Sequence, residues 1–230
     1  KLLAAKEKEV QFLSQAIKYI SLLKPIAFSP FAGTYMLGSR MADLTDYRGV
    51  PSVPYATQFL NNEFNGRTKG LLLEQFDLYD LDSESLQKSE KKFPLNREEY
   101  VSAISKKSLD YDNDDWNDDE LHELIQSAYK RFYKKAEEIG FKSNTKIVIK
   151  SDRFAFQLST ENEAKEISLD ANLVEPFVRM ELDHNLLHRL LRGPRFAHWN
   201  NAEIGSHLKY LRKPNQFERE LYHCLCFLHS

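Results

Sequence analysis

The stretch Lys24–Tyr35, KPIAFSPFAGTY, combines the end of a helix, a short buried strand and a glycine-containing loop. Lys24-Pro25 ends the helical pattern before it, because proline lacks an amide hydrogen and disfavours helical backbone in the preceding residue. Ile26–Ser29 is an apolar run suited to a buried strand. Pro30–Tyr35 follows as a loop at the carboxyl end of that strand, where α/β sheets tend to bind ligands. The stretch therefore predicts an α/β arrangement with a candidate site at the strand end.

The sequence on either side predicts two amphipathic helices and a second strand. In residues 1–23, apolar side chains recur at three- and four-residue spacing: Val10, Leu13, Ile17 and Ile20. Residues 54–65 show a similar apolar face, built from aromatic and leucine side chains. Residues 70–79 are rich in Leu and Phe, and we expect a strand there.

The long irregular segment from Pro30 to Pro54 contains the candidate binding residues. Such stretches are uncommon in compact domains and are often functional. A Gly-Thr pair after a strand can aim a backbone N–H and a hydroxyl into a cleft, and arginines bind phosphate or carboxylate. The expected substrate-binding residues are Gly33, Thr34, Tyr35, Arg40 and Arg48. An alternative of equal weight is that the glycines serve turns and the arginines satisfy loop carbonyls.

Residues 83–117 are charged and poor in apolar side chains, which predicts a linker. The acidic run from Asp110 to Asp119 suggests calcium, but it lacks the glycine and the closing glutamate of an EF-hand loop. We therefore favour a solvated linker whose carboxylates cap the next helix and stabilise its amino end. That helix is expected from about Asp118 to Gly140, with Gly140 as its stop.

Residues 118–230 predict a second unit of mixed α and β structure. Strand-like runs occur at residues 146–150, 154–158 and 177–182. Asp183 is placed to cap a helix over residues 185–191, which Gly193-Pro194 would end. A last helix is expected at about residues 216–228. The predicted fold class is α/β to α+β, with residues 1–82 and 118–230 as separate units.

Composition excludes several classes of function. Lys and Arg number 32 and Asp and Glu number 34, for a net charge of −2, whereas proteins that bind nucleic acid normally carry a basic excess. The only two cysteines, Cys224 and Cys226, are too close for an ordinary disulfide between them, which fits a reducing cytoplasm. No apolar run approaches the ~20 residues that a membrane span needs. We expect a cytoplasmic protein that does not bind nucleic acid and has no membrane span.

The histidines and cysteines form two clusters along the sequence. His184 and His188 stand four residues apart, on one face of a helix, but the glutamate of the zinc-protease pattern HExxH is missing and leucines dominate the helix. A second cluster lacks the CxxC spacing of structural zinc and contains His223, Cys224, Cys226 and His229. Neither cluster is predicted to bind a metal. The GxSxG, P-loop and GxGxxG patterns do not occur.

Residues 24–35 and the run Tyr47-Arg48-Gly49-Val50-Pro51 resemble the C-terminal half of a metallo-β-lactamase-fold protein. The closest branch holds UlaG-like hydrolases and CMP-N-acetylneuraminate hydroxylase-like proteins. The resemblance covers roughly residues 1–82 and implies an αββα sandwich with a metal site between its halves. Phe31 and Ala32 stand where hydrolase members usually offer a metal-binding histidine, although Gly33-Thr34 is retained. The resemblance therefore implies a zinc or iron centre whose ligands lie mostly outside this chain.

A weaker resemblance covers about residues 118–230. A helix, several strands and the run from Met180 to Gly193 look like a sterol-carrier-protein-2-like domain, which holds apolar ligands in a cavity. The run from Trp199 to His207 is similar to the C-terminal extension of the same hydrolase-like proteins. Residues 198–201 suggest either a polar pocket or, as we prefer, a packed turn with a satisfied histidine.

The leading hypothesis is a C-terminal fragment of a metal-dependent hydrolase-like protein, whose parent is a hydrolase or an oxygenase. Because the chain begins with Lys1, we expect it to be cut from something longer and to be inactive alone. It would then supply one wall of a cleft for a small, anionic substrate. The alternative is a non-enzymatic module that binds a protein, a lipid or a small ligand, with the leucine-rich helix 184–192 lining the cavity. A homo-oligomer, formed because half of the sandwich is missing, is a third option.

Overall fold

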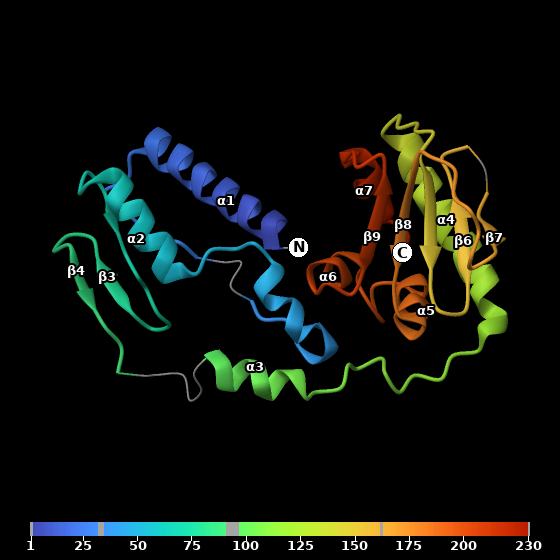
Figure 1. The fold of residues 1–230 in the computed structure, drawn as a ribbon, viewed down its shortest axis with the longest axis horizontal. Helices are drawn as coiled ribbons and strands as arrows, with labels where there is room; N and C mark the ends of the chain where they lie inside the picture. Colours follow the sequence, from blue (N-terminus) through green and yellow to red (C-terminus); the bar gives the residue numbers. More distant parts are fainter. Residues whose placement is uncertain (1, 32–34, 91–96, 162, 230) are drawn as a thin grey trace. The chain divides into compact units, whose positions relative to one another are not determined.

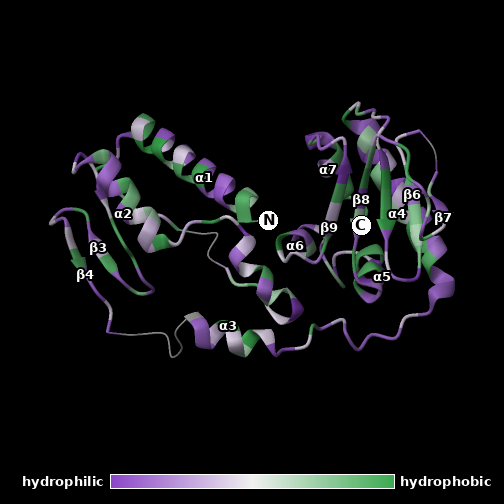
Figure 2. Cartoon of the chain, viewed as in Figure 1, coloured by the Kyte–Doolittle hydropathy of each residue, from purple (hydrophilic) through white to green (hydrophobic). Residues whose placement is uncertain are grey.

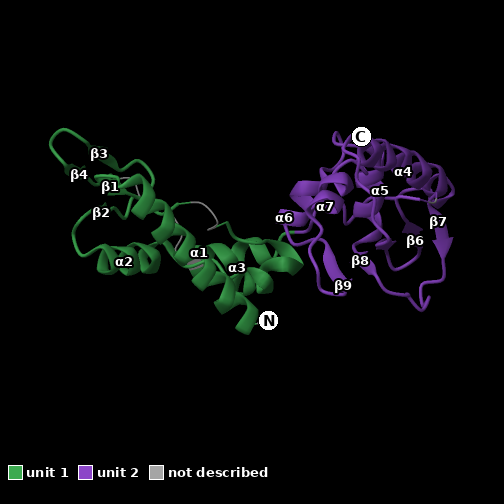
Figure 3. Ribbon diagram, turned by 90° about the horizontal axis from the view of Figure 1, so that it is seen from above, with its two compact units in different colours: residues 1–107 green, residues 108–230 purple. Residues whose placement is uncertain are grey.

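The computed structural model describes residues 2–31, 35–90, 97–161 and 163–229. Helices and strands are mixed throughout, so the fold is of the α+β class (Figure 1). The chain divides into two compact units, residues 1–107 and residues 108–230 (Figure 3). The boundary lies inside the predicted linker, and each unit is built from its own elements.

Unit 1 opens with the helix α1, Leu2–Leu23, which confirms the prediction from the apolar spacing. Leu13 and Ile20 are buried in α1, which packs against α2, Val53–Phe64. Ser52 caps α2 by accepting the amide hydrogen of Tyr55. Other apolar side chains of α1 lie on the surface, and Figure 2 shows hydrophobic segments along the whole helix.

A short parallel pair of strands brings together the residues just before the predicted site region and residues that follow α2. β1, Ala27–Phe28, pairs with β2, Lys69–Gly70, and α2 lies between them in the sequence. The Asn61 side chain of α2 accepts the Gly70 amide hydrogen at 2.7 Å and donates to the Gly70 carbonyl at 3.2 Å. A Cβ at position 70 would lie 2.6 Å from Asn61 Oδ1 and 2.8 Å from Phe28 Cζ, so both side chains would have to shift to admit it.

The expected strand over residues 70–79 is wrong for most of its length. β2 ends at Gly70, and the next strand, β3 (Leu78–Asp80), forms a hairpin with β4, Ser85–Gln87. Between them the Asp77 carboxylate accepts the amide hydrogens of Glu74 and Ser89, which holds a turn. A high content of leucine and phenylalanine therefore does not by itself predict a strand here. The hydrogen bonds to Asp77 hold a turn within the expected strand.

The segment expected to be irregular contains a nine-residue 3₁₀ helix, η1, Ser39–Tyr47. After it, Gly49 has φ +67°, and a Cβ there would lie 2.6 Å from the Ala5 carbonyl oxygen of α1. The helix α3, Arg97–Ser105, packs against η1, although it falls in the predicted linker. Among the described residues of unit 1, both sheets are two-stranded, so the αββα sandwich stays a prediction.

Unit 2 is built on a five-stranded sheet in the order β7-β6-β5-β8-β9. The central pair, β5 (Lys146–Lys150) and β8 (Phe177–Glu181), is parallel, and the other pairs are antiparallel. These two strands and β6, Ala155–Leu158, confirm the three predicted strands. The edge strands β7 (Lys165–Ile167) and β9 (Lys209–Lys213) were not expected, because they are largely charged and exposed.

The helices of unit 2 share one core with this sheet. A short 3₁₀ turn, η2 (Asp118–Glu120), leads into α4, Leu121–Glu138, which packs against α5 and α7. α5 spans His184–Arg192 after the predicted Asp183 cap, α6 spans Trp199–Ile204, and α7 spans Arg219–Leu225, shorter than expected. None of the helices in the described residues has the length and apolar content needed to cross a membrane.

One long-range contact of α4 ties the end of unit 2 to its middle. Arg131 donates to the carbonyl oxygen of Leu228 at 2.7 Å and to that of Leu191 at 3.4 Å. Leu228 itself is fully buried in the core. The last described turn is therefore part of the packed structure.

Residues 108–117 are not the solvated linker that their acidic composition predicts. Tyr111 is 3% exposed, and its hydroxyl lies 2.7 Å from His207 Nδ1. Asp114 receives Nε and Nη2 of Arg189 at 2.5 and 2.9 Å, while Asp110 receives Nη1 at 2.6 Å. Asp110 and Asp114 thus fasten the segment to α5, and their one shared cation, Arg189, comes from a distant part of the sequence.

Candidate functional site

The predicted binding loop is only partly described. Gly33 and Thr34 lie outside the described residues. Tyr35 is 45% exposed, and Arg40 is also exposed. The Arg48 guanidinium lies over the Tyr35 ring, 4.7 Å from its centroid, and donates to the Tyr35 carbonyl oxygen. The described structure therefore brings Tyr35 and Arg48 together.

Arg48 has a structural use in this loop. Its Nε donates to the Thr45 carbonyl oxygen at 3.0 Å, in addition to the bond to Tyr35. It also lines a groove of about 560 Å³ between α1 and the loop, together with Lys6, Glu9 and Asp46. These bonds agree with the alternative interpretation of Arg48, in which the arginine satisfies loop carbonyls and does not bind a substrate.

The metal implied by the family resemblance does not fit unit 1. All seven histidines and both cysteines of the sequence lie in residues 108–230. Unit 1 consequently offers neither an imidazole nor a thiolate, the ligands that most zinc and iron sites use. No catalytic step through such a metal follows from the residues of unit 1.

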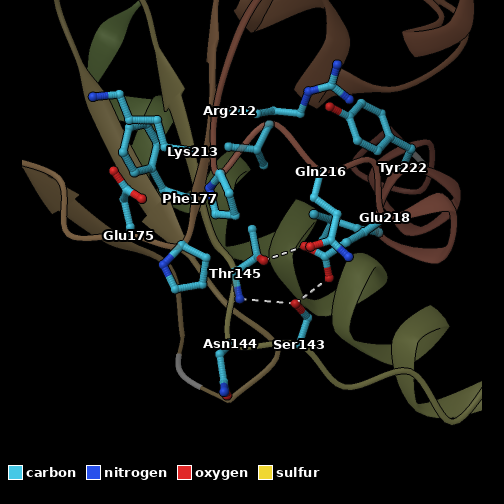
Figure 4. Close-up of a pocket in the computed structure, with 14 residues that line it drawn as sticks. Ser143, Asn144, Thr145, Glu175, Phe177, Arg212, Lys213, Gln216, Glu218 and Tyr222 are labelled. Carbon is cyan, nitrogen blue, oxygen red and sulfur yellow. Dashed lines mark hydrogen bonds between the residues drawn. The ribbon is translucent and has the colours of Figure 1, made fainter.

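Unit 2 carries a pocket at one end of its sheet (Figure 4). It has a volume of about 500 Å³ and lies where β5 and β8 begin, β9 ends and α7 begins. On its floor, Glu218 accepts hydrogen bonds from the hydroxyls of Ser143, at 2.6 Å, and Thr145. The Ser143 hydroxyl in turn accepts the Thr145 amide hydrogen at 3.0 Å.

The rim of this pocket is charged and aromatic. The Arg212 guanidinium lies 5.7 Å from the ring centroid of Tyr222, and both residues line the pocket together with Phe177. Burial raises the pKa of Tyr222 above its ordinary value, so its hydroxyl stays protonated at neutral pH. Lys213 and Glu175 also line the opening. The mixture of hydroxyls, both charges and aromatic rings suits a small polar ligand.

The leucines of the leucine-rich helix pack in a core and do not line the lipid cavity that the alternative hypothesis proposes. Leu187 and Leu190 of α5 are fully buried in the core of unit 2 and pack against its other side chains. His198 caps α6, since its Nδ1 accepts the Asn200 amide hydrogen at 3.3 Å, and Trp199 is 1% exposed. A packed turn with a satisfied histidine, the preferred interpretation, is confirmed.

Three side chains from two elements converge near the start of α4. His184 and His188, one turn apart on α5, direct Nε2 toward the same oxygen, Oδ1 of Asp118, at 2.6 and 3.2 Å. His184 is 6% exposed, His188 is fully buried, and the Asp118 side chain is 31% exposed. The three ligand atoms all lie within 4.8 Å of one another. These residues are therefore close enough together to be candidate ligands of one metal ion.

Aromatic side chains enclose this cluster. The Trp116 ring stacks on His188, with 6.1 Å between the ring centroids and 10° between the ring planes. Phe154 stacks on His184 with a centroid distance of 5.9 Å and an interplanar angle of 24°. Burial lowers the pKa of His188, so its imidazole is neutral at pH 7. Burial acts to raise the pKa of Asp118, but hydrogen bonds from His184, Arg153 and His188 outweigh it and leave the pKa lowered.

Ser151, His184 and Asp118 also stand in the order of a serine-hydrolase triad. The Ser151 hydroxyl lies 3.3 Å from His184 Nδ1, opposite the bond to Asp118. However, Ser151 is 4% exposed, and its Oγ accepts the amide hydrogens of Arg153 and Phe154 at 3.2 and 3.1 Å. A hydroxyl that closes a buried turn is not placed to attack a substrate, so this arrangement is not a nucleophilic triad.

Comparisons of the chain with protein-family models, with curated proteins and with solved structures give no match.

Sequence reasoning noted the spacing of His184 and His188 but predicted that neither binds a metal, and it did not find Asp118 as their partner. The only available signal was the i, i+4 spacing of the histidines, since Asp118 is distant in sequence and lies in an acidic run.

Proposed function

We propose that this chain is the C-terminal part of a metallo-β-lactamase-fold, metal-dependent hydrolase-like protein, with unit 1 as one wall of the cleft. The main support is the parallel pairing of β1 and β2, which are connected through α2. Residues 30–54 follow the carboxyl end of β1. Ligands of α/β sheets bind at that end of the strands. The same residues carry the family resemblance, so sequence and topology point to one place.

The surface of unit 1 supports a larger parent sheet. Parallel strands occur mostly in sheets covered on both faces, and a two-stranded sheet is marginal by itself. Large apolar side chains near β1 are nevertheless exposed: Leu23 by 77%, Ile26 by 71% and Phe31 by 87%. These side chains suit burial against a further layer of a sandwich.

Within this proposal the residues of the loop have different roles. Tyr35 and Arg40 contact a small anionic substrate, while Arg48 fixes the loop through the carbonyl oxygens of Tyr35 and Thr45. The metal is held by residues outside this chain, because unit 1 has no histidine. Two free cysteines fit a location in the cytoplasm.

The test uses the longest natural polypeptide that contains this chain, carrying Asp118→Asn to weaken metal binding by the histidine cluster of unit 2. We expect a stoichiometric transition metal and hydrolysis of ester, lactone or phosphoester substrates. Arg40→Ala should raise KM for an anionic substrate about tenfold, the effect of ~1.4 kcal/mol. The exposed Arg67→Ala is the matched control. A metal-free protein without hydrolase activity would rule the proposal out.

A second candidate, non-enzymatic binding of a small molecule by unit 2, is favoured by the pocket in Figure 4. Its charged rim suits a polar ligand better than a lipid chain. Native mass spectrometry of the purified chain should then show a bound small molecule, which is lost in Glu218→Ala and retained in the exposed control Glu220→Ala. Identical ligand-free spectra for the three proteins would count against this function.

A further inference from the structure

We infer that unit 2 binds one divalent transition-metal ion, with zinc as the first choice, through Asp118, His184 and His188. The site is independent of the proposed hydrolase centre. All three ligands lie in unit 2, outside the residues that resemble the metallo-β-lactamase fold.

The donor set is the first argument. Two imidazole nitrogens and one carboxylate oxygen form a ligand set that zinc and non-haem iron commonly use. The histidines come from successive turns of α5, and the aspartate begins η2 ahead of α4. Side chains on packed helices are held in place more firmly than side chains on a loop.

The distances are the second argument. Nε2 of His184 and Nε2 of His188 lie 2.6 and 3.2 Å from Asp118 Oδ1. In a tetrahedral zinc site with Zn–N bonds of about 2.0–2.1 Å, neighbouring ligand atoms are roughly 3.4 Å apart. A small outward movement of Asp118, whose side chain is 31% exposed, would therefore admit an ion. Three protein ligands leave one position for water.

The surroundings of the histidines are the third argument. A metal-bound histidine usually donates its other ring N–H to an oxygen, which fixes its orientation. Ser151 Oγ lies 3.3 Å from His184 Nδ1 and so contacts the ring on the side opposite Asp118. The stacked rings of Phe154 and Trp116 restrict the two imidazoles further.

A cluster held by hydrogen bonds alone accounts poorly for His188. Its side chain is fully buried, and its Nε2 lies 3.2 Å from Asp118 Oδ1, an oxygen that His184 Nε2 already approaches at 2.6 Å. The Asp118 carboxylate also accepts from Arg153, so hydrogen bonding does not require a second imidazole there. A second imidazole on the same oxygen is explained by a ligand that needs both.

The test is calorimetric titration of Zn²⁺ into the chelator-treated full chain. We expect one zinc per chain and at least tenfold weaker binding in Asp118→Asn, which keeps the side-chain size but removes the charge. His122→Gln, an exposed histidine on α4, is the matched control and should bind as the wild type does. Equal affinity for zinc in the wild type and Asp118→Asn would overturn the site.

A spectroscopic measurement separates lost binding from lost folding. Trp116 stacks on His188, so zinc should change the tryptophan fluorescence, and this change should disappear in Trp116→Phe. Cobalt in place of zinc should give the visible absorption bands of a four-coordinate ion in the wild type and not in His188→Gln. Circular dichroism shows whether each variant is folded. A folded wild type without a fluorescence change and without cobalt bands would overturn the inference.

Discussion

The two units of this chain use similar helices and strands but differ in how they bury them. In unit 2, side chains such as Phe132, Ile147 and Leu190 have no exposed surface and belong to one continuous core. In unit 1, Leu60 is well buried, but Leu3 and Leu22 of α1 are 79% and 69% exposed. An amphipathic pattern thus predicts a helix without saying what covers its apolar face.

The largest expected effect comes from Phe132→Ala in unit 2. Removing this fully buried ring should lower the free energy of unfolding by about 3–5 kcal/mol. Both tryptophans, Trp116 and Trp199, lie in unit 2, so urea unfolding followed by tryptophan fluorescence reports on this unit. Leu60→Ala in unit 1 is the matched control and should leave the fluorescence transition unchanged. A joint shift would show that the two units unfold together.

Arg189→Ala should have the next largest effect. This arginine joins α5 to Asp110 and Asp114, and its side chain is 17% exposed. Loss of these charged hydrogen bonds should cost about 2 kcal/mol in unit 2. Arg189→Lys should rescue little, because an ammonium group does not reproduce the paired geometry. The exposed Arg195→Ala is the control, and an equal loss there would refute the assignment.

The acidic segment that Arg189 holds shows where sequence reasoning ends. The helix from Asp118 and its amino-terminal charge were predicted, because capping and helical spacing are local properties. Burial of Tyr111 and pairing of Asp114 were not, because their partners His207 and Arg189 are remote in sequence. An acidic composition predicts a solvated segment only when no cation from a distant part of the sequence pairs with the carboxylates.

Gly49→Ala tests whether unit 1 is specifically packed. The residue has φ +67°, and the new Cβ would lie 2.6 Å from the Ala5 carbonyl oxygen. We expect a loss of about 1–3 kcal/mol, measured by faster amide exchange in α1 around Leu13. Gly66→Ala is the control, since it has φ +80° but no atom within 4 Å of the added Cβ. Equal effects would mean that backbone strain, rather than the contact with α1, decides the outcome.

The smallest effect is a local dependence on pH at the turn before β3. Hydrogen bonds from Lys88, Ser89 and Glu74 lower the pKa of Asp77 from 3.8 to about 2. Because the folded state binds this proton less tightly, the contribution to stability is complete above pH 3.8 and is lost as the pH falls through 2. An NMR titration of the carboxyl carbon checks this, and Lys88→Met should raise the pKa. A titration near 3.8 in the wild type would contradict it.

The candidate metal site was half visible in the sequence. The four-residue spacing of His184 and His188 predicts that both lie on one helix face, and the structure confirms that geometry. What the spacing does not contain is the approach of Asp118, which depends on packing α4 against α5. Without that carboxylate, a pair of histidines beside four leucines is better explained as part of a core.

The contact between Arg131 and Leu228 has a consequence for biosynthesis. A partly buried guanidinium in α4 receives its carbonyl partner almost a hundred residues later, from a turn whose leucine completes the core. While the ribosome is still making β9 and α7, that arginine lacks the Leu228 acceptor and has only the longer contact to Leu191, and the core has an open side. Unit 1 is translated first, but unit 2 reaches its native state only when the turn at Leu228 has emerged. The core of unit 2 is therefore completed by its last described turn.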